Sequence, residues 1–358
     1  MPANGEMLRL ARQLRGFQQI EAAKRLGIEQ PFLSRIENGL AEFRDEIVHK
    51  ASQAFNLPES FFHQRDAVYG APVSVHPMWR KKASVTAREL DTVISELNIR
   101  VMHLRRLLEG VEVASTSDLP QLDIEDFGSP EKIAGLVRAH WKVSNGPLKN
   151  LVMLAEKAGI IVIQSSLGGA SISGVTFAVP GAPPIVALNS DQPGDRQRFT
   201  LAHELGHLIM HRFPTPDMER EANEFAVALL MPAADIKPYF QGRKIDLSVL
   251  ASLKPEWRVS MAALMMRAHK LGCIQEAQYT YLWKMMSAKK YRLREPPELD
   301  FHPEEPTVMS NIIRVHLDSL GYSKEDLSMM LNVLAFELVE LYRIQHESPR
   351  RARLTVIK

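Results

Sequence analysis

Cysteine is almost missing from this chain of 358 residues, because Cys273 is the only one. A single thiol cannot form an internal disulfide framework, which excludes a disulfide-stabilised secreted domain and favours a reducing, cytoplasmic setting. Cys273 stands in an apolar context and is interpreted as a packed thiol rather than a redox group. Long apolar runs are also missing, and so is an apolar N-terminal signal segment. We therefore expect no membrane-spanning helix and no membrane partner.

An excess of charge of one sign is missing as well. The chain has 44 Lys and Arg against 42 Asp and Glu, so its formal net charge is +2. This balance neither requires nor excludes a nucleic-acid partner, and local motifs must decide that question. The hydrophobic content of 45% and the charged content of 24% are typical of a globular protein, and the length favours two or three domains.

The apolar pattern divides the chain into four segments. Residues 1–65 contain short helical patterns separated by glycines, and residues 66–128 are predicted to be a helical linker. Residues 129–270 combine helices with three short strands, and residues 271–358 form a helical C-terminal region of unknown role. The strands are expected at residues 160–163, 174–179 and 185–188. The predicted fold class is therefore mostly α with a small β-sheet (α+β), and we find no internal repeat.

Within the linker, residues 86–108 form a long amphipathic pattern. Its apolar side is expected either to pack on its own chain or to serve as a dimerisation helix.

Two histidines four residues apart, His203 and His207, lie inside the apolar run of residues 199–210. On a helix this spacing puts both side chains on one face, where both imidazoles can bind one Zn²⁺. Glu204 lies beside the first histidine and can reach a metal-bound water, which is the H-E-x-x-H arrangement of zinc peptidases. Buried histidine and glutamate are costly unless they are paired or bind a metal, so the apolar setting favours a metal site over a solvated helix.

A catalytic zinc usually takes three protein ligands and keeps one position for water. The next helix, predicted from about residue 216 to residue 230, supplies Glu219 as the preferred third ligand. Asn223 lies four residues later on the same face and is expected to brace a ligand histidine. Glu221 and Glu224 point to other sides of this helix and remain the alternatives.

His211 follows His207 by four residues and is also expected near the ligand face, in a supporting role. A ligand at this position would lie more than about 10 Å from the first histidine along the helix. In the expected mechanism, Zn²⁺ activates a water and polarises a carbonyl group, and Glu204 is the general base. Tyr239 and His211 are the candidates for stabilising the oxyanion.

Three sequence blocks carry a resemblance to a known family. They are FTLAHELGHL from Phe199, EREANEFA from Glu219, and LLMP ending at Pro232. Together they resemble the ImmA/IrrE family of zinc metallopeptidases over roughly residues 130–270.

This resemblance implies a gluzincin-like site in which His203, His207 and Glu219 bind zinc and Glu204 acts as the base. It also implies cleavage of regulatory proteins, typically helix-turn-helix repressors of prophage, mobile-element or stress-response genes.

Residues 18–39 follow a pattern of helix, glycine turn and helix. Gly27 makes the turn, and Ala23 is small where the two helices must cross. The outer part of the second helix presents side chains that can read base edges in the major groove. These are Gln30, Phe32, Ser34 and Arg35. Gln19, at the start of the preceding helix, is expected to contact phosphate and to brace Gln30.

This region resembles the XRE-type (phage-repressor-like) helix-turn-helix family over residues 7–62. The resemblance implies an all-α domain that binds a double-stranded DNA operator. Two features depart from the family: Glu29 stands where Ser or Thr commonly caps the recognition helix, and residues 1–65 hold nine Lys and Arg against eight Asp and Glu. We expect weak or partner-dependent DNA binding, with a domain kept for protein contacts as the alternative.

The sequence thus predicts a cytoplasmic, DNA-binding zinc metalloendopeptidase that regulates transcription by cleaving a repressor or an antitoxin; a homodimer is compatible with this prediction. A second interpretation is a transcriptional regulator whose zinc domain is a sensor with little turnover. A third is an antitoxin whose partner surface is the helix at residues 86–108 or the C-terminal helices. The intact Glu204 favours the first, since a sensor needs no general base. Several basic side chains near the C-terminal region are interpreted as a solvated face. These are Lys284, Lys289, Lys290, Arg292 and Arg294.

Overall fold

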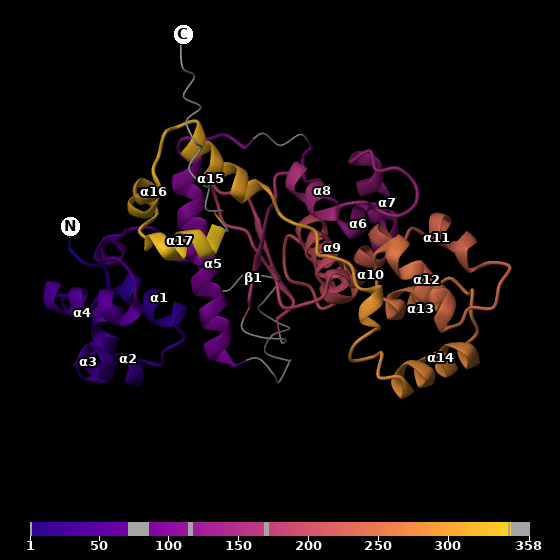
Figure 1. Cartoon of the computed structure of the whole chain (residues 1–358), viewed down its shortest axis with the longest axis horizontal. Helices are drawn as coiled ribbons and strands as arrows, with labels where there is room; N and C mark the ends of the chain where they lie inside the picture. The colour runs from indigo at the N-terminus through magenta and orange to yellow at the C-terminus, as the bar shows by residue number, and fades with distance from the viewer. Residues whose placement is uncertain (1, 71–85, 114–116, 168–171, 343, 345–358) are drawn as a thin grey trace, which may run out of the picture. The chain divides into compact units, whose positions relative to one another are not determined.

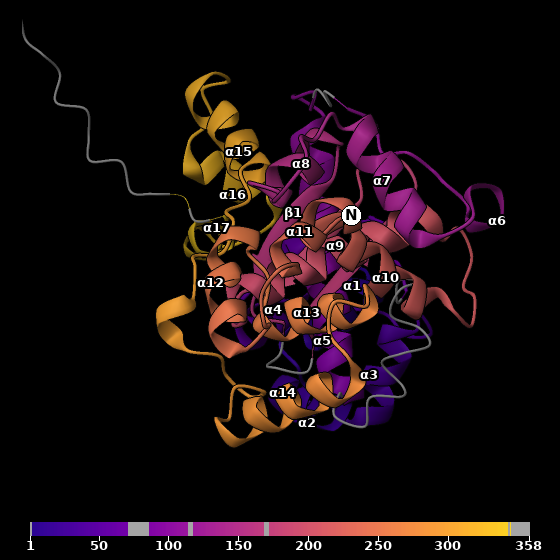
Figure 2. The same ribbon diagram turned by 90° about the vertical axis from the view of Figure 1, so that its right-hand side faces the viewer.

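The computed structural model describes residues 2–70, 86–113, 117–167, 172–342 and 344, and Figure 1 labels its helices and strands. The chain divides into two compact units. The first unit consists of Met1–Asp66, Arg106–Val111 and Met309–Lys358, and the second of Ala67–Arg105 and Glu112–Val308. Helices dominate both units and a single small sheet lies in the second, which confirms the predicted α+β class (Figures 1 and 2). Among the described helices, none combines the length and apolarity needed to cross a bilayer.

The first unit is built entirely of helices over its described residues. Its elements are α1 (Gly5–Leu14), α2 (Gln19–Leu26), α3 (Gln30–Glu37), α4 (Asp45–Phe55), the 3-10 helix η1 (Glu59–His63), α15 (Val308–Asp318), α16 (Lys324–Leu331) and α17 (Ala335–Tyr342). Leu26 of α2 and Leu33 and Ile36 of α3 are fully buried, as expected for two helices that share one core. Between α2 and α3, Gly27 has φ +67°, a left-handed conformation that glycine adopts without steric cost.

The pair α16 and α17 repeats the pair α2 and α3. All four helices have eight residues, and each helix of the second pair begins 305 positions after its counterpart, at Lys324 and Ala335 instead of Gln19 and Gln30. Asn332 has φ +52° at the position of Gly27, so both turns use the left-handed region. The backbone N–H groups of Ile28 and Val333 donate to the carbonyls of Ala23 and Ser328, at 3.0 and 3.1 Å, which are also equivalent positions.

This repeat is not apparent in the sequence, because the outer faces of the two pairs differ. The buried positions agree, since Leu331 and Leu338 are as fully buried as Leu26 and Leu33. At the four positions of α3 expected to read DNA, α17 carries other side chains. These are Ala335, Glu337, Val339 and Glu340. The second pair therefore keeps the geometry of a helix-turn-helix, but two of these four positions are acidic and would repel DNA phosphates.

The second unit contains a three-stranded sheet in the order β1-β3-β2. The central strand β3 (Ile185–Asn189) is parallel to β1 (Ile161–Ser165) and antiparallel to β2 (Gly174–Phe177). Every residue of β3 is buried, which explains its continuous apolar sequence. All three strands lie where the apolar pattern predicted them.

The second unit also contains helices. They are α5 (Ala87–Leu108), of which the last three residues belong to the first unit, α6 (Ile124–Phe127), α7 (Pro130–His140), α8 (Leu151–Lys157), α9 (Gly194–Met210), α10 (Met218–Leu230), α11 (Ala233–Phe240), α12 (Leu247–Trp257), α13 (Met261–Lys270), α14 (Glu276–Ala288) and the 3-10 helix η2 (Pro297–Leu299). Of these helices, α8 and α9 pack on the sheet. One apolar core joins α7, α8, α9, α10, α12 and α13 to β1 and β3. The apolar side of α5 is buried within the chain, and the loop expected at residues 111–128 contains the single turn α6.

The second unit continues past residue 270, where the peptidase segment was expected to end. Glu304 accepts hydrogen bonds from the backbone N–H groups of Leu151 and Val152 at the start of α8, at 2.6 and 2.8 Å. It also forms a buried ion pair with Arg198 of α9. Glu156 of α8 in turn accepts from the N–H of Thr307 at 2.9 Å. These long-range contacts make residues up to 308 part of the same body.

Candidate functional site

The helices α9 and α10 lie side by side and position the candidate metal ligands (Figures 1 and 2). Gly206 of α9 lies at their closest approach. A Cβ atom at this position would lie 3.1 Å from Phe225 Cδ1 and 3.2 Å from Ala222 Cα, both on α10. The missing side chain therefore lets α10 approach the turn of α9 that carries His203 and His207.

His203, His207 and Glu219 meet at one point between the two helices, and their ligand atoms all lie within 4.8 Å of one another. The Nε2 atoms of the two histidines are 3.0 Å apart. Glu219 Oε2 lies 3.4 Å from His203 Nε2, and Glu219 Oε1 lies 3.3 Å from His207 Nε2.

These contacts, in which each histidine faces a different carboxylate oxygen of Glu219, fit the donor set and spacing of a zinc site. Zinc binds histidine nitrogen and carboxylate oxygen at about 2.0–2.2 Å in tetrahedral geometry, so neighbouring ligand atoms lie roughly 3.3 Å apart. The three observed separations are 3.0, 3.3 and 3.4 Å. Two imidazoles and one carboxylate are also the ligands of many catalytic zinc sites, which leave a fourth position for water.

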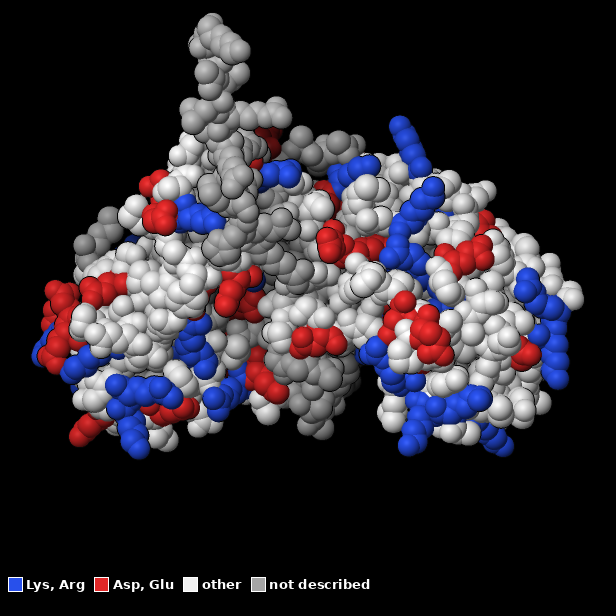
Figure 3. All heavy atoms as spheres, viewed as in Figure 1, with Lys and Arg blue, Asp and Glu red and all other residues white. Residues whose placement is uncertain are grey.

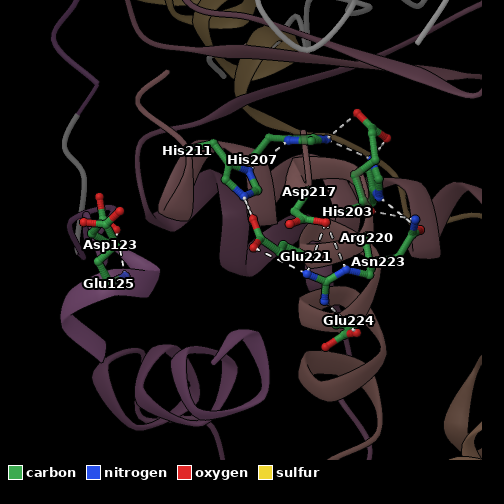
Figure 4. A network of polar contacts seen from close by, with 11 residues as sticks. Asp123, Glu125, His203, His207, His211, Asp217, Arg220, Glu221, Asn223 and Glu224 are labelled. Atoms are coloured by element: carbon green, nitrogen blue, oxygen red, sulfur yellow. Dashed lines mark hydrogen bonds and ion pairs between the residues drawn. The ribbon is translucent and has the colours of Figure 1, made fainter. Parts of the chain in front are cut away.

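Both histidines are oriented by contacts at their other ring nitrogen (Figure 4). His203 Nδ1 lies 3.2 Å from Asn223 Oδ1, and His207 Nδ1 lies 3.1 Å from His211 Nδ1. His211 Nε2 lies 3.1 Å from Glu221 Oε2. Because the amide oxygen and the carboxylate can only accept, these partners assign the proton to Nδ1 of both candidate ligands. Nε2 of each ring is then free to bind a metal.

The Nε2 atoms that would bind a metal can instead carry protons, and the histidines then donate hydrogen bonds to Glu219. Burial raises the pKa of Glu219, but hydrogen bonds from His203 and His207 lower it by more, to about 2. Burial lowers the pKa of His203, but its hydrogen bond with Glu219 and the charges of Glu204 and Glu219 outweigh this effect and raise it. Burial and the neighbouring His207 lower the pKa of His211 to about 4. Glu219 is therefore an anion at neutral pH, while His211 is neutral and can accept a hydrogen bond.

Glu204 is buried next to the ligands and is held by the sheet. Its Oε2 accepts a hydrogen bond of 2.6 Å from Thr176 Oγ1 of β2. Gly174, two residues earlier on the same face of β2, lies against Thr200, four residues before Glu204 on α9. Two strand residues and four helix residues each advance roughly 6–7 Å, which is why these two pairs match. Sequence reasoning missed Thr176, although the period-two pattern of the strand was the available signal.

The metal site and Glu204 open into a cavity of about 870 Å³. Neither residue expected to stabilise an oxyanion lines this cavity. The hydroxyl of Tyr239 donates to Glu256 Oε1 at 2.8 Å, and both ring nitrogens of His211 are engaged in the contacts described above. The side chains of Tyr239 and His211 therefore bind other partners and do not face the cavity where an oxyanion would form.

The alternative third ligands also have other partners. Glu221 contacts His211, and Glu224 forms ion pairs with Arg220 and Lys270 at 3.3 and 3.5 Å (Figure 4). Of the three acidic residues considered, Glu219 is the one whose carboxylate meets both histidines.

In the first unit, Gln30 at the start of α3 is connected to a buried ion pair. Gln30 Nε2 donates to Gln19 Oε1 at 2.8 Å, and Gln19 Nε2 donates to Glu37 Oε2 at 2.8 Å. Glu37 pairs with Arg12 through two contacts of 2.6 and 3.0 Å. The structure therefore brings Gln19 and Gln30 together, and it adds two residues that the sequence did not single out. A carboxylate held by a bidentate arginine is a rigid support for Gln19, and through it for Gln30 at the start of α3.

The other residues expected to contact DNA also lie on α3. Arg35 is exposed, and Phe32 and Ser34 are partly exposed. Glu29 is the N-cap residue of α3, but its side chain makes no capping hydrogen bond. The site thus keeps an acidic side chain where a DNA phosphate would approach.

Two segments of the chain match family models. Residues 155–269 match the peptidase family described as the IrrE N-terminal-like domain, and residues 8–62 match the helix-turn-helix family. No curated protein matches the chain. The matches confirm the predicted fusion of an ImmA/IrrE-like peptidase domain with an N-terminal XRE-type helix-turn-helix domain. The first matched segment contains all three candidate ligands and Thr176, and it ends before α14.

Proposed function

We propose that this protein is a DNA-binding zinc metallopeptidase that regulates transcription by cleaving a regulatory protein, either a helix-turn-helix repressor or an antitoxin. One observation carries the proposal. The Nε2 atoms of His203 and His207 lie 3.0 Å apart, each is 3.3–3.4 Å from a different carboxylate oxygen of Glu219, and the buried Glu204 lies beside them at the wall of a cavity.

The chain's own residues supply the remaining chemistry. When bound, zinc acidifies a water molecule and polarises the carbonyl group of the bond to be cleaved. Glu204 accepts the proton of the attacking water and returns it to the leaving amine. Thr176 donates to one oxygen of Glu204, so the other oxygen is available for this proton transfer. Asn223 and His211 keep the ligand histidines in the required orientation.

The helix-turn-helix domain is proposed to bring this peptidase to operator DNA. Gln30 and Arg35 can each form bidentate contacts with purine edges. Since residues 1–65 are nearly neutral in charge, few phosphate contacts support this binding, and a narrow set of sites or a partner protein is required.

A regulator with little turnover is the alternative function. The pair α16 and α17 favours it, because Glu337 and Glu340 on α17 would repel DNA phosphates and suit a protein partner better. Phe336 and Met329 of this pair are 53% and 68% exposed and could contact such a partner.

The two functions are separated by a comparison of the wild type with Glu204→Gln. Both proteins are analysed for zinc and then incubated with repressors and antitoxins encoded in the same genome. We expect one zinc per chain in both, and cleavage of one candidate by the wild type alone. If the wild type binds zinc yet cuts nothing that the variant leaves intact, the peptidase proposal fails. His203→Ala, which removes a ligand, is the control for metal content.

A further inference from the structure

The cavity at the candidate metal site has a second wall that lies outside the matched peptidase segment. One side carries the metal ligands and Glu204 on α9 and α10. Other lining residues come from α14 and the segment that follows it, among them Trp283, Tyr291, Arg292 and Leu293. Leu293 is 88% exposed, so an apolar side chain faces the solvent-filled space.

This wall is fixed to the rest of the second unit by a buried lysine. Lys254 of α12 is 1% exposed and contacts Asp195 of α9 and Glu295, each at 2.7 Å. Glu295 also accepts from the backbone N–H groups of Met261 and Ala262 at the start of α13, at 3.1 and 3.2 Å. Burial of this lysine is tolerable only because two carboxylates surround it. These contacts therefore hold the segment after α14 in place as part of the cavity wall.

Most charged groups of the cavity are paired, and two cations are not. Lys254 has its two carboxylates, and Arg294 pairs with Asp300 at 2.5 Å. Arg196 and Arg292 have no carboxylate within ion-pair distance among the residues that the structure describes. Arg196 donates to Ser173 Oγ at 3.3 Å, and Arg292 lies 5.2 Å from the centroid of the Trp283 ring. Figure 3 shows further Lys and Arg side chains over the α14 region, at the lower right.

The position of Arg196 on α9 sets its distance from the candidate metal site, where the bond would be cleaved. It precedes His203 by seven residues in α9, close to two helical turns, so both side chains lie on one face of this helix. The two positions are about 10 Å apart along the helix axis. An extended polypeptide covers this distance in about three residues.

We propose that the cavity selects an extended polypeptide segment with an acidic side chain about three residues from the bond to be cleaved. Arg196 is the counter-charge of this acidic group, Arg292 adds positive charge to the same cavity, and Trp283 and Leu293 contact an apolar neighbour. Both arginines are thus specificity residues rather than catalytic ones. The inference rests on the proposed peptidase function and adds the class of substrate to it.

A binding experiment tests the electrostatic part without turnover. The full-length Glu204→Gln protein, loaded with zinc, is titrated against fluorescein-labelled peptides of alanine and leucine that differ at one position, which is glutamate, glutamine or lysine. We expect the glutamate peptide to bind about fivefold more tightly than the lysine peptide, as for a partly exposed ion pair. Adding Arg196→Glu or Arg292→Glu should abolish or invert this ratio. Arg243→Glu, an exposed position outside the cavity, should leave it unchanged.

A cleavage experiment then separates the inference from the proposed function. The wild type is incubated with a peptide library from the proteome of its source, and the new termini are identified by mass spectrometry. Enrichment of Asp or Glu two to four positions from the cut, lost in Arg196→Glu, supports the inference. Cleavage without acidic enrichment, equal binding of the three peptides, or an equal effect of Arg243→Glu overturns it and leaves the peptidase function standing. Selective binding of the glutamate peptide, with no cut that Glu204→Gln lacks, supports the cavity preference and contradicts the peptidase function.

Discussion

Thr176 of the sheet forms a hydrogen bond with Glu204, the candidate general base, and Gly206 lets α9 and α10 pack closely. Each role depends on a distance of a few ångströms between elements far apart in the sequence. A carboxylate can turn around its last torsion angle unless a donor fixes it, and the Thr176 hydroxyl is that donor for Glu204. Gly206 likewise affects the position of Glu219, because its missing side chain lets α10, which carries Glu219, lie close to α9.

We expect Thr176→Val to lower kcat about tenfold, because a hydrogen bond to a charged group contributes on the order of 1.5–3 kcal/mol. Zinc content should stay unchanged, since Thr176 is not one of the three candidate ligands. Thr176→Ser keeps the hydroxyl and should keep most of the activity. Equal kcat in the valine and serine variants would show that this hydrogen bond does not support catalysis.

We expect Gly206→Ala to lower the free energy of unfolding by about 1–3 kcal/mol, because the new methyl group must displace Phe225 or the α10 backbone. The shift should also weaken zinc binding, since Glu219 moves with α10. Gly135→Ala is the matched control, because a Cβ at this exposed position of α7 meets no atom within 4 Å. This control should be neutral or stabilising by about 0.5–1 kcal/mol. Denaturant unfolding and zinc titration of both variants check the prediction.

At the scale of secondary structure, a comparison of the two helix-turn-helix pairs distinguishes the residues that the fold requires from the residues expected to contact DNA. Both pairs keep the buried leucines and the left-handed residue in the turn. At the outer face of its second helix, the first pair carries Gln30 and Arg35, whereas the second pair carries Ala335 and Glu340 at the equivalent positions. Glu340 of α17 stands where Arg35 stands on α3, which places an anion where a phosphate or guanine contact would be needed.

The repeat provides a matched control for DNA binding. Gln30→Ala should weaken binding to the operator roughly 5- to 150-fold, the loss expected for one bidentate base contact. Glu340→Ala should leave DNA binding unchanged. Both variants should retain zinc, because the metal site lies in the other unit. Electrophoretic mobility shifts at low salt measure this comparison, and a loss of binding in Glu340→Ala would assign DNA contacts to the second pair as well.

Helices and strands whose apolar residues recur at a regular spacing could be predicted from the sequence. The helical spacing of His203 and His207 was sufficient to place both on one face, and a shared face singled out Glu219 and Asn223. Thr176 was missed because the sequence does not reveal which strand lies against α9. The second helix-turn-helix was missed because its similarity is confined to buried and turn positions, which carry no chemical motif.

At the scale of the whole chain, the division into two units assigns DNA contacts and metal chemistry to separate bodies. The sequence predicted these two roles, but it did not predict that residues 276–308 belong to the body with the metal site. Lys254 and Glu295 are far apart in the sequence, and nothing in their local context indicates that they meet. Such pairings follow from packing, which a single sequence does not show.

Removal of zinc should therefore affect one unit. At a free zinc concentration about a thousandfold above Kd, binding stabilises the folded state by about 4 kcal/mol. We expect a chelator to lower the unfolding midpoint of the second unit and to leave operator binding intact. Glu219→Gln should show the low midpoint without chelator. Differential scanning calorimetry and a DNA-binding assay on the same samples check this, and an unchanged midpoint with chelator would contradict the metal assignment.

The carboxylates of Glu295 and Glu304 also limit how this protein can evolve. Both reach back into the matched peptidase segment, to the buried Lys254 and Arg198. A recombination event that joined a new C-terminal region after α13 would leave two buried cations short of a partner. Such an exchange succeeds only if the incoming segment brings two acidic residues to the same places. The residues that hold this segment in place thus differ from those that line the cavity, so we expect the lining to be exchangeable without loss of the buried ion pairs.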